Sequence, residues 1–118
     1  MRKLIDANVI LRYLLNDDKE QAEKASLVIS EGAFTLSEVI AEVVYVLHDV
    51  YKVEKDEIRD TLIALFDEVT VDNEPVIEEA LKLYAKEGLD YVDGILAARS
   101  RYLNETVFSF DKKLNSLL

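Results

Sequence analysis

The sequence lacks several residue types on which common active sites depend. It has no cysteine and no tryptophan, one histidine (His48), three glycines and one proline in 118 residues. Without cysteine the chain forms no disulfide, no thiolate zinc site and no cysteine nucleophile. A single histidine argues against a His-dependent triad and against a multi-histidine metal site. Low glycine and proline with 50% apolar residues excludes collagen-like and disordered chains.

Long hydrophobic runs are also absent. No apolar stretch approaches the ~20 residues that a membrane span needs. The first residues do not form a signal peptide, because only Leu4 and Ile5 are apolar before Asp6. We therefore expect a cytoplasmic protein with no membrane partner. The length predicts one domain, residues 1–118.

Acidic side chains outnumber basic ones by 24 to 14, which gives a formal net charge of −10. This balance argues against a passive nucleic-acid binder, which needs a basic face. The excess of acid lies in residues 1–87, whereas residues 88–118 hold four acids and four bases. A cation bound to some of these four acids would leave the C-terminal quarter basic.

Short β-forming stretches alternate with helical ones along the chain. The strands are expected at 3–5, 33–36, 69–71 and 106–110, and the helices at 8–15, 19–30, 38–51, 54–67, 75–87 and 91–103. Asn8, Ser37 and Asp90 are suited to cap three of these helices. The alternation predicts an α/β fold, a three-layer α/β/α domain whose central, short parallel sheet has four or five strands flanked by helices.

Three acids lie at the ends of expected elements that meet at one edge of the sheet. Asp6 and Asp111 end the first and last expected strands, and carboxyl ends of parallel strands share an edge. Asp93 lies in the first turn of the helix that leads into the last strand. Purely structural roles remain open, because Asp111 could cap a turn over 112–117 and Asp93 could complete a capping box with Asp90.

The helix expected at 38–51 adds further acids on one stripe. Glu38 and Glu42 are like charges four residues apart, with no lysine or arginine on this helix before Lys52. A solvated helix face would account for them, as would a cation site. Carboxylates without cysteine or useful histidine favour a hard cation such as Mg²⁺ or Mn²⁺. Such an ion can activate a water and stabilise charge on a phosphodiester.

Four motifs occur in an order that resembles the PIN-domain ribonucleases, in particular VapC-type toxins of prokaryotic toxin–antitoxin pairs. The motifs span nearly the whole chain: Ile5-Asp6-Ala7-Asn8-Val9-Ile10-Leu11, Ser37-Glu38-Val39-Ile40-Ala41-Glu42-Val43-Val44, Asp93-Gly94-Ile95-Leu96-Ala97-Ala98 and Phe108-Ser109-Phe110-Asp111. Each motif alone is weak. Together, in this order and spacing, they make a fairly strong match.

The resemblance implies an Mg²⁺- or Mn²⁺-dependent endoribonuclease that cuts RNA with a metal-activated water. Its acidic, metal-binding quartet would be Asp6, Glu42, Asp93 and Asp111. Glu42 is preferred to Glu38 because the family's glutamate is followed by an apolar pair, here Val43-Val44. Asn8 and Ser109 would support the quartet by orienting ligands or water. The family also implies a homodimer and an inhibitory antitoxin partner.

Five basic residues close in sequence to these acids are candidates for RNA phosphate contacts. They are Arg12, Arg99, Arg101, Lys112 and Lys113. Exposed, solubilising side chains are the alternative explanation for all five.

The chain departs from the family pattern in two places. Ala7 stands where the family often has threonine, and only residues 112–118 follow the last acidic motif, which leaves little room for a further strand. Two other functions remain open. A phosphatase of the haloacid-dehalogenase type would need a second aspartate where Asn8 stands. A non-catalytic PIN-like scaffold that binds a partner is disfavoured because all four acids are present.

Overall fold

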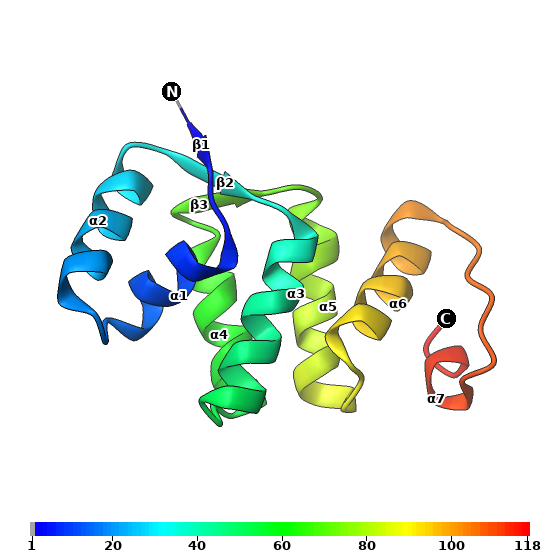
Figure 1. Ribbon diagram of the computed structural model, residues 1–118. Helices are drawn as coiled ribbons and strands as arrows, with labels where there is room; N and C mark the ends of the chain where they lie inside the picture. Colours follow the sequence, from blue (N-terminus) through cyan, green and yellow to red (C-terminus); the bar gives the residue numbers. More distant parts are fainter. Residues whose placement is uncertain (1) are drawn as a thin grey trace.

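The computed structural model describes residues 2–118 and contains a short parallel sheet flanked by helices (Figure 1). The strands are β1 (Lys3–Leu4), β2 (Ala33–Thr35) and β3 (Val69–Val71), in the order β1-β2-β3. Lys3 is aligned with Ala33, and Ala33 with Val69. Helices connect the strands, as parallel pairing requires. The α/β class predicted from the sequence is confirmed.

The helices lie close to their expected positions. They are α1 (Ala7–Leu15), α2 (Lys19–Ser30), α3 (Ser37–Tyr45), the π-helical turn η1 (Val46–Val50), α4 (Lys55–Leu65), α5 (Glu74–Glu87), α6 (Tyr91–Leu103) and α7 (Lys112–Asn115). The helix expected at 38–51 changes at Val46, whose carbonyl accepts from the N–H of Tyr51, five residues on. None of the helices within 2–118 combines the length and the apolar character that crossing a membrane requires.

Two helix starts differ from the caps that the sequence suggested, and a third agrees in position alone. Asp6, not Asn8, caps α1, because its Oδ1 accepts from the N–H of Val9 at 3.0 Å. Leu36 occupies the cap position of α3, so Ser37 is already helical. Asp90 does stand at the cap position of α6, but its side chain makes no capping hydrogen bond. The expected capping box with Asp93 is therefore wrong.

The main hydrophobic core lies between the sheet and helices α1, α3, α4 and α5. Its fully buried side chains include Ile10, Ile40, Ile58, Leu62, Leu65, Ile77 and Leu81. A second, smaller cluster joins α5, α6 and α7 and consists of Leu83, Leu89, Ala97 and Leu114. Helix α6 also contributes Tyr91 and Ala98 to the main core. Helices α6 and α7 lie on the outer side of α5, away from β1 (Figure 1).

Helices α5 and α6 approach each other closely where α6 has its one glycine. A Cβ atom on Gly94 would lie 2.8 Å from the carbonyl oxygen of Ala80. The C-terminal half of α6 is fixed as well, since Arg101 forms an ion pair with Glu79 of α5 at 2.8 Å. Asn104 ends α6 in the left-handed conformation, with φ of 56°. The chain therefore leaves α6 at the end of the molecule that is remote from β1.

The prediction of a fourth strand at 106–110 is wrong for a single chain, and no fifth strand occurs within residues 2–118. Residues 106–110 are extended but unpaired, with Phe108 83% and Phe110 92% exposed. The physical reason is the packing of α6 along α5, which carries this segment past the far side of α6 (Figure 1). Strand β1 consequently pairs with β2 alone among the described strands.

Candidate active site

The sheet fixes the position of Asp6 at the carboxyl end of β1. Ile5 donates its N–H to the carbonyl of Phe34 at 2.9 Å, which extends the pairing with β2 by one residue. Thr35 is fully buried, and its hydroxyl donates to the carbonyl of Ile5 at 3.0 Å. The next residue, Asp6, is exposed. The backbone before Asp6 is therefore held by the sheet, while the Asp6 carboxylate is exposed at the N-terminus of α1.

Helix α3 begins at this same edge, directly after β2, and carries Glu38 and Glu42 one turn apart. Both glutamates are exposed, and within residues 2–118 neither forms an ion pair. Glu38 lies near the first turn of α6, because its charge raises the pKa of Tyr91 there. The structure thus brings Glu38 to α6, while the choice of Glu42 continues to rest on the sequence pattern.

Asp93 lies in the first turn of α6 and is partly buried. Burial raises the pKa of its carboxyl group, and the nearby negative charges of Asp90 and Asp111 raise it further. No cation within residues 2–118 is paired with it. Within the predicted quartet, Asp93 and Asp111 therefore lie close enough for the charge of Asp111 to affect the carboxyl group of Asp93.

Asp111 caps the short helix α7, as the structural alternative had suggested. Its Oδ1 accepts from the N–H of Leu114 at 2.9 Å. Ser109 steadies this turn from both sides: its hydroxyl accepts from the N–H of Asp111 at 3.0 Å, and its carbonyl accepts from Nδ2 of Asn115 at 2.8 Å. Ser109 thus orients Asp111 through the backbone. Asn8 is exposed in the first turn of α1, and its side chain makes no hydrogen bond within the part of the chain that the structure describes.

The donor set suits a hard divalent cation, but its arrangement in one chain does not. Carboxylate oxygens are the ligands that Mg²⁺ and Mn²⁺ prefer. Within residues 2–118, however, no group of three or more histidine, aspartate or glutamate side chains is placed to hold a metal ion. The quartet is divided, with Asp6 beyond β1 and Asp111 at the opposite end of the molecule (Figure 1).

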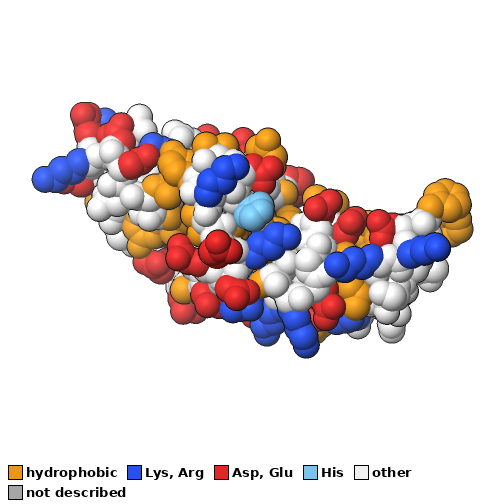
Figure 2. Space-filling model, turned by 90° about the horizontal axis from the view of Figure 1, so that it is seen from below, with side chains coloured by type: hydrophobic (Ala, Val, Ile, Leu, Met, Phe, Trp, Pro, Cys, Tyr) orange, Lys and Arg blue, Asp and Glu red, His pale blue; other side chains and the backbone are white. Residues whose placement is uncertain are grey.

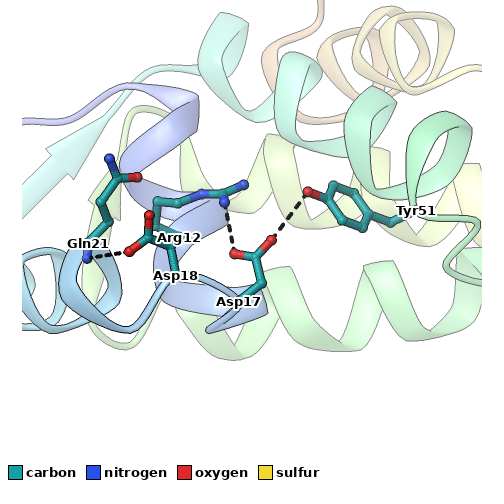
Figure 3. A network of polar contacts seen from close by, with 5 residues as sticks. All are labelled: Arg12, Asp17, Asp18, Gln21 and Tyr51. Atoms are coloured by element: carbon teal, nitrogen blue, oxygen red, sulfur yellow. Dashed lines mark hydrogen bonds and ion pairs between the residues drawn. The ribbon is translucent and has the colours of Figure 1, made fainter.

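Three of the five candidate phosphate-contacting residues are engaged inside the chain. Arg12 pairs with Asp17 at 2.8 Å, and Asp17 also accepts from the hydroxyl of Tyr51 (Figure 3). Arg99 holds Glu105 through two hydrogen bonds of 2.5 and 2.8 Å. Arg101 pairs with Glu79 and donates to the carbonyl of Leu117.

Lys112 and Lys113 differ from these arginines. Both are exposed in α7, next to Asp111, and no ion pair within residues 2–118 involves them. Of the five candidates, they are therefore the two that the ion pairs within residues 2–118 leave available to a phosphate.

Sequence reasoning missed a cavity of about 500 Å³ between η1, α5 and the start of α6. Within residues 2–118 the buried hydroxyls of Tyr84 and Tyr91 have no hydrogen-bond partner, and both residues line this cavity. Burial raises the pKa of Tyr91 to about 12, an effect that the nearby Ser37 partly offsets. His48 is partly buried, and its Nδ1 lies 3.1 Å from the carbonyl of Val53.

Figure 2 shows this single histidine beside a basic side chain and among acidic ones, on the face seen from below. Lys55 lines the same cavity as His48, and its Nζ lies over the ring of Tyr84, 4.7 Å from the ring centroid. The π-helical turn η1 places His48 there, and no periodicity in the sequence indicated such a turn.

Comparison with known proteins decides the family. The model of the PIN domain matches residues 3–117. The chain belongs to the PIN domain family. It is also similar to a VapC ribonuclease of Aquifex aeolicus (strain VF5), with 28% identity over 123 aligned positions that cover 98% of this chain and 91% of the relative.

Membership of the PIN domain family confirms the resemblance that the four motifs carried and supports a VapC-like nuclease. The match runs through β1, α3, α6 and the Asp111 turn, so no candidate acid lies outside it. The shorter end of the chain, which had suggested a departure from the family, does not prevent coverage of 91% of the relative.

Proposed function

We propose that this PIN-domain protein is an endoribonuclease that hydrolyses RNA phosphodiesters. Its acidic residues are Asp6, Glu42, Asp93 and Asp111, and its cofactor is Mg²⁺ or Mn²⁺. Asn8 and Ser109 support the acids, and Lys112 and Lys113 contact RNA phosphates. The protein forms a homodimer in the cytoplasm and is inhibited by an antitoxin protein. The similarity to a VapC ribonuclease supports this function.

The observation that carries this proposal is the electrostatic setting of Asp93. Its carboxylate is partly buried next to two further aspartates and has no cationic partner within residues 2–118. Such an arrangement costs folding energy without an evident structural benefit, which is typical of functional sites. A divalent cation, when bound, would neutralise the acids and supply Lewis-acid chemistry for attack on phosphorus.

The geometry of the chain supports the remaining roles. Asp6 directly follows Ile5, whose carbonyl accepts from the Thr35 hydroxyl, and its own Oδ1 accepts the capping bond from Val9, so its carboxylate is pre-oriented. The two lysines of α7 provide positive charge next to Asp111, on a surface that is otherwise strongly acidic. An RNA strand could therefore reach the acids at the α7 end without crossing a repulsive face.

Cleavage of a mixed RNA pool tests the proposal. The wild-type chain should cut in Mn²⁺ and stop cutting in EDTA, and Asp93→Asn should lower the rate at least about 100-fold, as loss of a catalytic carboxylate commonly does. Asp90→Asn is the matched control, since it removes a neighbouring acid of the same turn that lies outside the quartet. Equal loss in both variants, or metal-independent cutting, would contradict the assignment.

A non-catalytic interaction scaffold is the second candidate, because the quartet does not assemble in one chain. The same assay separates the two functions. A scaffold leaves the RNA pool intact under every metal condition. Its melting temperature should also be unchanged by millimolar Mg²⁺ or Mn²⁺, whereas ion binding to the folded state alone must raise it.

A further inference from the structure

We propose that the site is completed by a second copy of this chain, whose residues 106–110 pair with the open edge of β1 and bring Asp111 to Asp6. The proposal rests on the proposed function for the role of these two acids, but the strand exchange itself stands on the fold. Two features within residues 2–118 support it. Strand β1 has one unpaired edge, and residues 106–110 are extended but belong to no sheet.

Strand β1 presents the open edge. The N–H groups of Lys3 and Ile5 donate to the carbonyls of Gly32 and Phe34. Because successive residues of a strand direct their N–H and C=O groups to opposite sides, Leu4 between them points these groups away from β2. Leu4 is also 54% exposed. An edge strand of this kind is a template for pairing with another chain.

Residues 106–110 present the complementary strand. Their exposure alternates, with 106, 108 and 110 exposed and 107 and 109 partly buried, as in an extended strand. Within residues 2–118 they donate no backbone hydrogen bond. Phe108 and Phe110 pack edge to face against each other in this exposed position, with ring centroids 5.2 Å apart. In Figure 2 an apolar group projects from this end of the molecule.

The chain's own segment does not reach its own β1. Its start is fixed by α6, which is pressed onto α5 at Gly94 and tied to it by the Arg101–Glu79 pair. Its end is fixed by α7, where Leu114 is 1% exposed between α5 and α6. Figure 1 shows α3, α5 and α6 between this segment and β1. Pairing within one chain would therefore require both anchors to break, whereas pairing between two copies breaks neither.

Reciprocal exchange also explains the divided quartet. Each copy carries one open edge and one free segment, so a two-fold pair satisfies both at once. If the added strand runs parallel, like the three already in the sheet, its carboxyl end lies at the edge where Asp6 stands. Asp111 of one copy then faces Asp6 of the other. Each site of the dimer would contain acids from both chains.

The absence of cysteine permits a clean crosslinking test of the exchange. Leu4→Cys and Phe108→Cys change exposed residues at the middle of each segment, so both variants should fold. When the two proteins are mixed and oxidised, the proposal predicts a covalent dimer of one of each. The chain that carries both substitutions should also form covalent dimers. A compact, internally crosslinked monomer, or no crosslink in the mixture, would overturn the exchange.

Complementation tests whether Asp111 completes the partner's site. Asp6→Asn and Asp111→Asn proteins are unfolded together, mixed in equal amounts and refolded, each alone being inactive. Random pairing makes about half of the dimers mixed, with one intact site of two, so about a quarter of wild-type activity should return. Sites built within one chain return none. Crosslinking without recovered activity would refute the shared site alone, and an inactive wild type would refute the proposed function instead.

Discussion

The contact between Gly94 and α5 gives a stability prediction whose sign is decided by geometry. A methyl group at this position would lie 2.8 Å from the carbonyl oxygen and 3.3 Å from the Cα of Ala80. Both are backbone atoms, so no side-chain rotation relieves the contact. The helices must separate by several tenths of an ångström, and Asp93 is the residue directly before the one that moves.

Two opposing effects set the magnitude for Gly94→Ala. Alanine in place of glycine inside a helix gains about 1 kcal/mol of intrinsic propensity. Overpacking of a close contact typically costs about 1–3 kcal/mol, and a contact with rigid backbone belongs at the upper end. The net expectation is a loss of about 1–2 kcal/mol. For 118 residues the entropy of unfolding is about 0.25 kcal/mol/K, so the melting temperature should fall by about 4–8 °C.

Urea and thermal unfolding measure this change directly. Val92→Ala is the matched control, since Val92 lies in the same turn and is 58% exposed, and it should alter stability by less than about 0.5 kcal/mol. A Gly94→Ala protein that is more stable than wild type would show that only helix propensity operates. That result would refute the close packing of α5 on α6, and with it the anchor that holds residues 106–110 away from β1.

Three further outcomes follow from particular side chains. Asp93→Asn should stabilise the fold at pH 7, because the raised pKa of Asp93 makes its charged form unfavourable when folded; in urea titrations this gain should vanish as the pH falls below the ordinary carboxyl range. Burial raises the pKa of Tyr91 from its ordinary value of 10.0 to about 12, so wild type should lose stability as the pH rises from 10 to 12, and Tyr91→Phe should lose less in the same measurement. Leu114→Ala should cost about 2 kcal/mol and expose residues 104–113 to limited proteolysis, whereas Leu118→Ala, at a position 41% exposed, should do neither.

The first three strands and the long helices could be predicted from the sequence because local signals agree with the tertiary structure there. Apolar spacing and turn residues locate α1, α2, α4, α5 and α6 to within about two residues. The π-helical turn could not be predicted in this way. It depends on the Tyr51–Val46 hydrogen bond and on the seating of His48 against Val53, both of which are set by the packing of neighbouring elements.

The prediction of the last strand was wrong for a different reason. Residues 106–110 have a clear local β pattern, and they are indeed extended. Whether an extended segment joins a sheet depends on where its two ends are held, and those ends are fixed by Gly94 and Leu114 outside the segment. A local pattern predicts conformation here but not partners. The convergence expected for Asp6 with Asp111 depended on that partner, so it failed together with the strand.

The structural and functional interpretations of Asp6 and Asp111 are compatible once single oxygens are considered. Each carboxylate uses Oδ1 to accept one backbone N–H, from Val9 in α1 and from Leu114 in α7. An ionised carboxylate has about four acceptor positions, so the capping bond leaves Oδ2 free for a cation or a water. The cap also limits side-chain rotation before any ligand binds, which lowers the entropy that binding must overcome. Asparagine retains the cap but not the charge, so Asp6→Asn should fold as stably as wild type and yet lose activity.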